Sequence, residues 1–240
     1  MAISPLRSFV LAAALWLPAM FFLWFSLSSA VVFPVIRLSG AILTAWMPEL
    51  VLSMGQEYHD AVYSYAADIS GVAGFQSAKL AVEEQRKNVL VFCYSLPLLF
   101  GLVMATPLNW RRTFAQLGIG FAMLTLTETF GLVTEVLKTM ALGIAPAIAK
   151  ALEADYPLVA LQAGAMAQQH MQASLAGHGL SPTAIALAAQ FGYLVLPAVV
   201  PVALWILMNR RFLEILVGWS GEPGTGNAGP TPEQRGGAGA

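Results

Sequence analysis

The chain has 240 residues, of which 58% are hydrophobic and only 10% are charged, and its mean hydropathy is +0.69. This composition is far more apolar than that of a soluble domain of the same size, so it predicts a membrane protein whose first partner is the lipid bilayer. The formal net charge is -1 and no basic stripe runs along the chain, which argues against a nucleic-acid partner.

Four long apolar runs predict four membrane-spanning helices, because about 20 apolar residues cross the roughly 30 Å of a bilayer's hydrocarbon core. They cover residues 9–33, 88–108, 113–140 and 183–208. The first run is too long for a cleaved signal peptide, and it contains Trp16, Pro18 and Trp24, which suit a permanent anchor. The expected fold class is therefore an all-α transmembrane bundle with two segments outside the bilayer.

Arginines beside the helix ends predict the orientation, because such residues are retained in the cytoplasm. They lie in the N-terminal residues 1–8, in the short loop 109–112 and in the C-terminal residues 209–240: Arg7, Arg111, Arg112, Arg210 and Arg211. Placing these three segments on one side puts both ends of the chain in the cytoplasm. The Gly- and Pro-rich stretch after Trp219 has almost nothing to bury and is expected to be disordered.

The first external segment, residues 34–87, begins with a stretch up to residue 48 whose apolar side chains recur at helical spacing. This stretch is expected to form a short helix along the outer surface of the bilayer. The remainder favours a small β hairpin, with Gly71 and Gly74 supplying the turn. A segment this small cannot bury much of a core by itself, so we expect it to pack on the membrane surface or on a partner.

The second external segment, residues 141–182, is rich in Ala and Gln and favours helix. Pro157 predicts a break within it, and Gly177 and Gly179 predict its end. In the predicted topology both external segments lie on the same side of the bilayer.

Two glutamates interrupt the third apolar run. Glu128 and Glu135 are seven residues apart in LTLTETFGLVTEVLKTM, so they share one helix face. A charge inside the bilayer costs at least about 2.5 kcal/mol, so this face is expected to contact protein or water. Lys138 is placed to pair with Glu135 near the outer surface. The expected partners of Glu128 are Gln190 and Tyr193 of the last run, or a residue of another protein.

Three roles remain open for Glu128. It could be an uncharged, hydrogen-bonded residue of helix packing, a contact with a partner, or a carrier of protons or ions. A partner contact indicates an accessory protein that binds another membrane protein, or a second copy of the chain in a homo-oligomer. Ion transport indicates a small transporter subunit, although transporters usually contain internal repeats and none is evident in this chain.

Cys93 is the only cysteine, so no intrachain disulfide and no cysteine metal cluster can form. It lies at the outer end of the second run, and His170 and His178 belong to an external segment on the same side. An integral-membrane cysteine peptidase, with one of these histidines activating the thiol, is therefore an alternative. An unpaired cysteine in an apolar helix is more often a small hydrophobic residue, so a non-enzyme is favoured.

Metal and cofactor sites are not expected. His59 is remote in sequence from the other two histidines, which are themselves eight residues apart, and no acidic residues repeat beside them at ligand spacing. The chain also lacks a glycine-rich phosphate loop.

Four stretches resemble the family of membrane proteins encoded with exosortase H. They are LWLPAMFFLW followed by FPV, NVLVFCYSLPLLFGLVMATP, FGLVTEVLKTM, and FGYLVLPAVVPVALWILMNRRFLE. The resemblance extends to about residue 216 and implies a multi-pass protein of the bacterial inner membrane. It also implies an association with an exosortase, a multi-spanning cysteine protease that processes proteins bearing a C-terminal sorting helix.

The resemblance does not carry proteolytic chemistry to Cys93. In exosortases the active-site cysteine is followed by Ser-Gly, whereas Tyr94, Ser95 and Leu96 follow Cys93. No arginine lies within the later runs to complete the cysteine, arginine and histidine set. The expected function is therefore that of a non-catalytic accessory protein in protein sorting, with an exosortase or its sorted substrate as partner.

Overall fold

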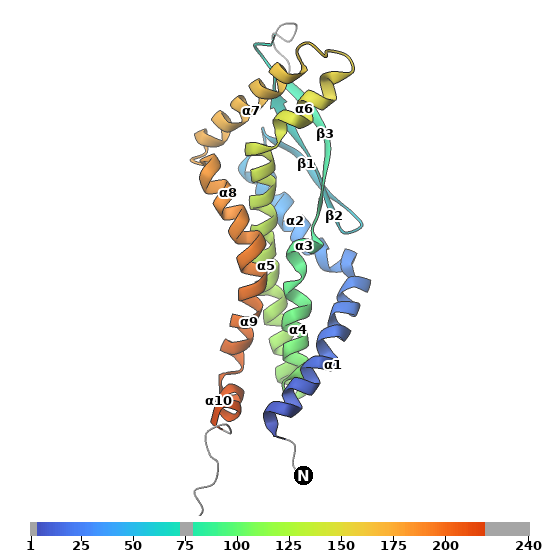
Figure 1. Ribbon diagram of the computed structural model, residues 1–240, viewed down its shortest axis with the longest axis vertical. Helices are drawn as coiled ribbons and strands as arrows, with labels where there is room; N and C mark the ends of the chain where they lie inside the picture. Colours follow the sequence, from blue (N-terminus) through green and yellow to red (C-terminus); the bar gives the residue numbers. More distant parts are fainter. Residues whose placement is uncertain (1–3, 73–78, 219–240) are drawn as a thin grey trace, which may run out of the picture.

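The computed structural model describes residues 4–72 and 79–218. The molecule is elongated, with most helices running along its long axis, a small sheet with α6 and α7 at one end, and the start of α1 with α10 at the other (Figure 1). In chain order the elements are α1 Pro5–Ser26, α2 Ser28–Trp46, β1 Val51–Glu57, β2 Asp60–Asp68, β3 Lys79–Asn88, α3 Leu90–Cys93, α4 Ser95–Ala105, α5 Trp110–Leu142, α6 Ile144–Glu153, α7 Ala160–Gly177, α8 Pro182–Gln190, the π-helix η1 Phe191–Val195, α9 Leu196–Met208 and α10 Arg210–Gly218.

The described chain contains four helical stretches that are long and apolar enough to cross a membrane: α1, α2, α5 and the continuous stretch from α8 through α9. This number agrees with the sequence prediction, but the set differs. Residues Leu90–Ala105, in the second predicted span, form a shorter apolar stretch, and α2 fulfils the criterion in its place.

The first predicted span, residues 9–33, is divided between two helices. α1 begins with Pro5 at its first position and with the Ser4 hydroxyl accepting a hydrogen bond from the Arg7 amide. It buries none of its side chains and ends before Leu27, where α2 begins. The stretch expected to lie on the bilayer surface, residues 34–48, forms the C-terminal part of α2 and buries Val35, Ile36 and Leu43.

α5 is the axis of the molecule. The Asn109 side chain caps its first turn by accepting a hydrogen bond from the Arg112 amide. Its 33 residues give a length of about 50 Å, which exceeds the roughly 30 Å of hydrocarbon in a bilayer. The helix therefore continues beyond the apolar half of the molecule and reaches the sheet, α6 and α7 (Figure 1).

The sheet has three antiparallel strands in the order β1-β2-β3, so the expected hairpin is a three-stranded sheet. β2 and β3 are the predicted strand pair. β1 was not predicted, because its residues do not alternate regularly between buried and exposed positions. Alternate residues of β2 are buried. Gly71 follows β2 with φ of 90°, a conformation suited to glycine, and Gly74 lies outside the described residues.

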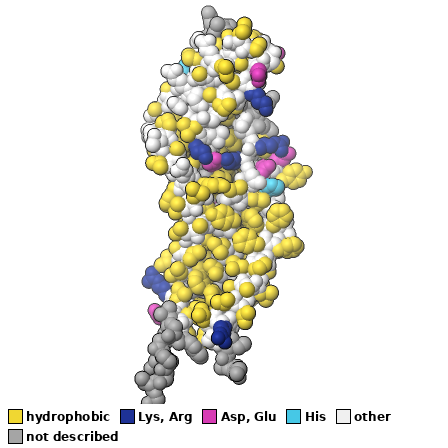
Figure 2. Space-filling model, viewed as in Figure 1, with side chains coloured by type: hydrophobic (Ala, Val, Ile, Leu, Met, Phe, Trp, Pro, Cys, Tyr) yellow, Lys and Arg dark blue, Asp and Glu magenta, His cyan; other side chains and the backbone are white. Residues whose placement is uncertain are grey.

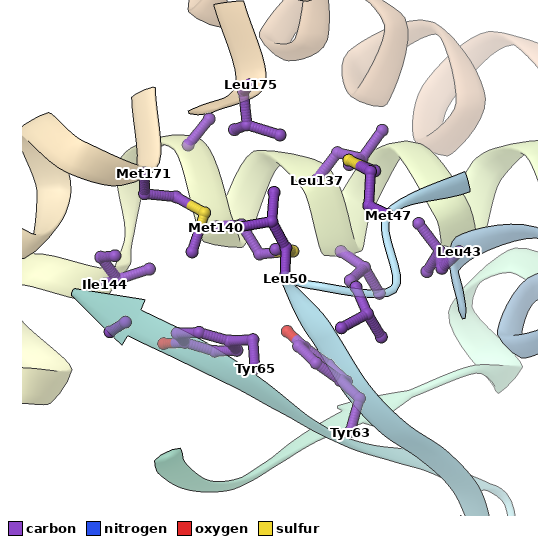
Figure 3. Close-up of a cluster of buried hydrophobic side chains, with 14 of the residues drawn as sticks. Leu43, Met47, Leu50, Tyr63, Tyr65, Leu137, Met140, Ile144, Met171 and Leu175 are labelled. Atoms are coloured by element: carbon purple, nitrogen blue, oxygen red, sulfur yellow. The ribbon is translucent and has the colours of Figure 1, made fainter. Parts of the chain in front are cut away.

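A shared core holds this end of the molecule together. Tyr63 and Tyr65 of β2 face Met140 of α5, and Met171 and Leu175 of α7 close the cluster from the opposite side (Figure 3). The two segments predicted to be external therefore share a core with α5 of their own chain, a contact that the sequence did not predict.

Residues 141–182, the second segment predicted to be external, are mainly helical, as their sequence predicts. Pro157 lies between α6 and α7, and α7 ends at Gly177, with Gly179 at φ of 77°. The tail expected to be disordered lies outside the described residues from residue 219 onward, and the residues before it form α10.

Candidate functional site

In the view of Figure 2, hydrophobic side chains cover the surface between a row of charged side chains across the middle and a few charged side chains near the lower end. Further charged side chains lie above the middle row. Glu135 follows Arg112 by 23 positions on α5, which is about 35 Å along a helix. This spacing is close to the roughly 30 Å of a hydrocarbon core, so Glu135 lies where a bilayer would end.

Glu135 is bound by two lysines from different parts of the chain. The Lys87 ammonium donates to Glu135 Oε1 at 2.5 Å, and the Lys138 ammonium contacts Oε2 at 2.8 Å. The predicted pairing of Lys138 with Glu135 is confirmed. Lys87 was missed because it lies in β3, 48 positions earlier. The sequence places Lys87 immediately before the second apolar run, so it is expected near the same bilayer surface as Lys138. That position could have indicated Lys87 as a second partner of Glu135.

The ion-paired cluster opens into a groove of about 420 Å³. Lys87, Glu135 and Lys138 line one part of it, and Gln190 and Tyr193 line another. Four of the five polar residues singled out from sequence therefore meet in one place. Two ammonium groups face one carboxylate here, so the described lining carries one uncompensated positive charge. Such a groove can bind a carboxylate or a phosphate through charge-assisted hydrogen bonds.

An irregular turn positions the Tyr193 side of the groove. In η1 the Leu196 amide donates to the Phe191 carbonyl, five residues back. Pro197 has no amide hydrogen, so it cannot donate to the Tyr193 carbonyl as a regular helix requires. The Tyr193 ring packs edge-on against Phe92, with centroids 5.9 Å apart.

A close helix crossing holds η1 against α5. A Cβ atom on Gly192 would lie 2.9 Å from the Gly131 Cα, so the two backbones approach more closely than any larger residue permits. This crossing fixes the distance across the groove between Tyr193 and the α5 residues.

Glu128 lies apart from the groove. The Ser95 hydroxyl donates to Glu128 Oε1 at 2.5 Å, and Glu128 is only 1% exposed. Its partner is thus Ser95 of α4, which corrects the expectation of Gln190 or Tyr193. Glu128 Oε2 has no hydrogen-bond partner among the described residues. The side chain is enclosed between α4 and α5 and is not on a docking surface.

Cys93 and the histidines are at separate places. Cys93 is 0% exposed and lies beside the Glu128 carboxyl. His170 Nδ1 is 2.9 Å from the Asp68 carbonyl, and His178 Nδ1 is 3.0 Å from the Ser174 carbonyl. The structure therefore does not bring Cys93 together with either histidine. No group of three or more His, Cys, Asp or Glu side chains within residues 4–72 and 79–218 is arranged to hold a metal ion.

Comparison with known families gives a match to the exosortase H-associated membrane proteins over residues 3–166 and 157–212. The chain belongs to this family. The match confirms the resemblance and includes the groove, the Glu128 contact and all four apolar stretches. The family's description connects this membrane protein with exosortase H. None of the curated proteins and none of the solved structures matches the chain.

Proposed function

We propose that this member of the exosortase H-associated family is a non-catalytic accessory protein of an exosortase sorting system, and that its polar groove binds an acidic group of the exosortase or of its sorted substrate. The groove carries this proposal. It combines a partly exposed, uncompensated positive charge with a position where the apolar surface ends, in a chain whose family is described as exosortase-associated.

The proposed site of action is the bacterial inner membrane. In this arrangement α1, Leu90–Ala105, the first two thirds of α5, and the stretch from η1 through α9 cross the bilayer, while the sheet, α6 and α7 lie outside. The arginine pairs in the first turns of α5 and α10, at the end of the molecule where α1 begins (Figure 1), support a cytoplasmic location for that end. The groove then opens on the opposite side, where the sheet lies.

The preorganised lysines support binding. The side chains of Lys87 and Lys138 are 35% and 37% exposed, while the Glu135 side chain between them is 7% exposed. Each ammonium is thus held by a buried carboxylate and still reaches solvent, so a ligand does not bear the full entropic cost of ordering it. The enclosed positions of Cys93 and Glu128 support a packing role for both and weigh against the peptidase and transporter hypotheses.

Purification of the tagged protein from its native membranes in mild detergent tests the proposal. Mass spectrometry should identify an exosortase, or a protein with a C-terminal sorting helix, that copurifies with the unaltered chain. Lys138→Gln should reduce this recovery by about tenfold, since a hydrogen bond to a charged group contributes about 1.5–3 kcal/mol. The matched control is Lys150→Gln on α6, which neutralises an exposed lysine outside the groove.

Two results would contradict the proposal. One is equal recovery of the same partner with Lys138→Gln and Lys150→Gln, which would remove the groove from the interface. The other is a homo-oligomer with no further protein, which would leave the association with exosortase without a physical contact.

A further inference from the structure

A second polar cavity lies at the opposite end of the apolar surface, where α5 begins and α9 ends. It has a volume of about 630 Å³ and lies between the loop that follows α4 and the junction of α9 with α10. Arg112, Arg210 and Arg211 line it, and the lining contains no acidic residue. None of these three guanidinium groups has an ion-pair partner in the described part of the chain. The cavity therefore concentrates three uncompensated positive charges.

The floor of this cavity is rigid and polar. Gln116 of α5 and Asn209 exchange two amide hydrogen bonds of 3.1 and 3.2 Å. Asn209 is only 3% exposed, and its amide also donates to the Trp205 carbonyl at 3.0 Å. These contacts fasten the bend between α9 and α10 to α5, so Arg210 and Arg211 are held opposite Arg112.

The remaining wall of the cavity is apolar. Leu108, Leu207, Phe212 and Ile215 line it, and Ile215 is 60% exposed. In α10, the sequence RRFLEILVG sets charged residues beside apolar ones, as in helices that lie in the interface of a bilayer. Glu214 belongs to the same helix but does not line the cavity.

We propose that this cavity binds the phosphate-bearing headgroup of an anionic phospholipid from the adjacent leaflet. The guanidinium group matches a phosphate with two parallel hydrogen bonds, and three of them suit a ligand with more than one negative charge. The apolar wall continues the lipid-facing surface, so an acyl chain leaves the cavity without crossing polar residues. Basic pockets between membrane helices are a known mode of binding for such headgroups. The site is separate from the groove and does not depend on it.

Native mass spectrometry of the full chain in detergent tests this site. The protein is titrated with cardiolipin, phosphatidylglycerol and phosphatidylcholine, and adducts are expected with the first two. Each basic residue near an anionic headgroup contributes roughly fivefold to binding. The triple variant Arg112→Gln, Arg210→Gln, Arg211→Gln should therefore bind the anionic lipids about 100-fold more weakly.

The matched control is Arg111→Gln, which removes an exposed arginine next to Arg112 that does not line the cavity. It should bind lipid as the unaltered chain does. The triple variant Arg112→Lys, Arg210→Lys, Arg211→Lys keeps the positive charges. It therefore controls for misfolding or inverted insertion of the triple glutamine variant. It should bind the anionic lipids more tightly than the triple glutamine variant and more weakly than the unaltered chain, because the charge attraction remains while the paired hydrogen bonds of each guanidinium are lost.

Three outcomes would overturn the inference. Equal binding by the triple glutamine variant, folded by circular dichroism, would show that the cavity holds no lipid. A loss with Arg111→Gln as large as with Arg112→Gln alone would indicate general attraction to the basic surface. If inorganic phosphate displaced the lipid and bound the cavity as tightly as the anionic lipids do, the site would be assigned to a free anion. A triple variant that fails to fold is replaced by Arg210→Gln, with an expected fivefold loss.

Discussion

The crossing of η1 and α5 should be sensitive to a single methyl group. In Gly192→Ala the added Cβ would lie 2.9 Å from the Cα of Gly131 and 3.2 Å from the Thr134 hydroxyl. Ordinary contacts between carbon atoms are about 3.5–4.0 Å. The obstructing atom belongs to the backbone of α5, so it cannot rotate away, and the two helices have to separate.

Overpacking of this kind costs about 1–3 kcal/mol. For a chain of this size each kcal/mol changes the melting temperature by about 2–4 °C. The matched control is Gly118→Ala on α5, where a Cβ has no neighbouring atom within 4 Å. Alanine should there be neutral, or stabilising by up to about 1 kcal/mol, because it favours helix more than glycine does.

Thermal unfolding of both variants in the same detergent, followed by circular dichroism, makes the comparison. Gly192→Ala should melt below the unaltered chain and Gly118→Ala at or above it. Because Gln190 and Tyr193 flank the crossing, Gly192→Ala should also lower recovery of the copurifying partner. Equal melting temperatures for the two variants would refute the close approach of the helices.

Three further predictions concern buried groups. Glu135→Gln should lower stability by about 1–2 kcal/mol in the same melting assay, since it leaves two one-third exposed lysines without their carboxylate; an unchanged melt would contradict this. Cys93 is 0% exposed, so the native protein should resist maleimide and react after denaturation in SDS, whereas rapid native labelling would show the thiol to be open. Burial, with the charge of Tyr63, raises the pKa of Tyr65 to about 12 from 10.0. The stability provided by the neutral form of Tyr65 is present below pH 10 and is lost as the pH rises toward 12. The variant Tyr65→Phe should therefore unfold at a higher pH than the unaltered chain. An identical alkaline unfolding transition for the two proteins would count against the raised pKa.

Features encoded within a few residues could be predicted from sequence. The apolar composition and run lengths predicted a membrane protein with four long helices, and four stretches fulfil that criterion. Pro157 and Gly177 marked helix ends because a missing amide hydrogen and a missing Cβ act locally. The pairing of Lys138 with Glu135 was equally accessible, because residues three apart meet on one helix face.

Run length was less informative where two elements share one apolar stretch. Residues 9–33 are continuous in hydropathy, yet the helix is interrupted at Leu27. β1 escaped prediction because one of its faces packs on α2 while the other lacks a regular pattern of burial. For β1, the neighbouring element rather than local propensity determines where the chain pairs.

The sequence by itself indicated that the protein is surrounded by lipid, and it gave the approximate number of apolar helices, the family resemblance and the residues suited to polar contacts. Only the tertiary structure decided which of them meet. Lys87 joins Glu135 across 48 positions and Ser95 binds Glu128 across 33, so the two glutamates of one helix face belong to a groove and to a buried contact, respectively. Periodicity defines a face of one helix, but the partner of that face depends on how closely other helices approach, and here that approach rests on Gly131 and Gly192.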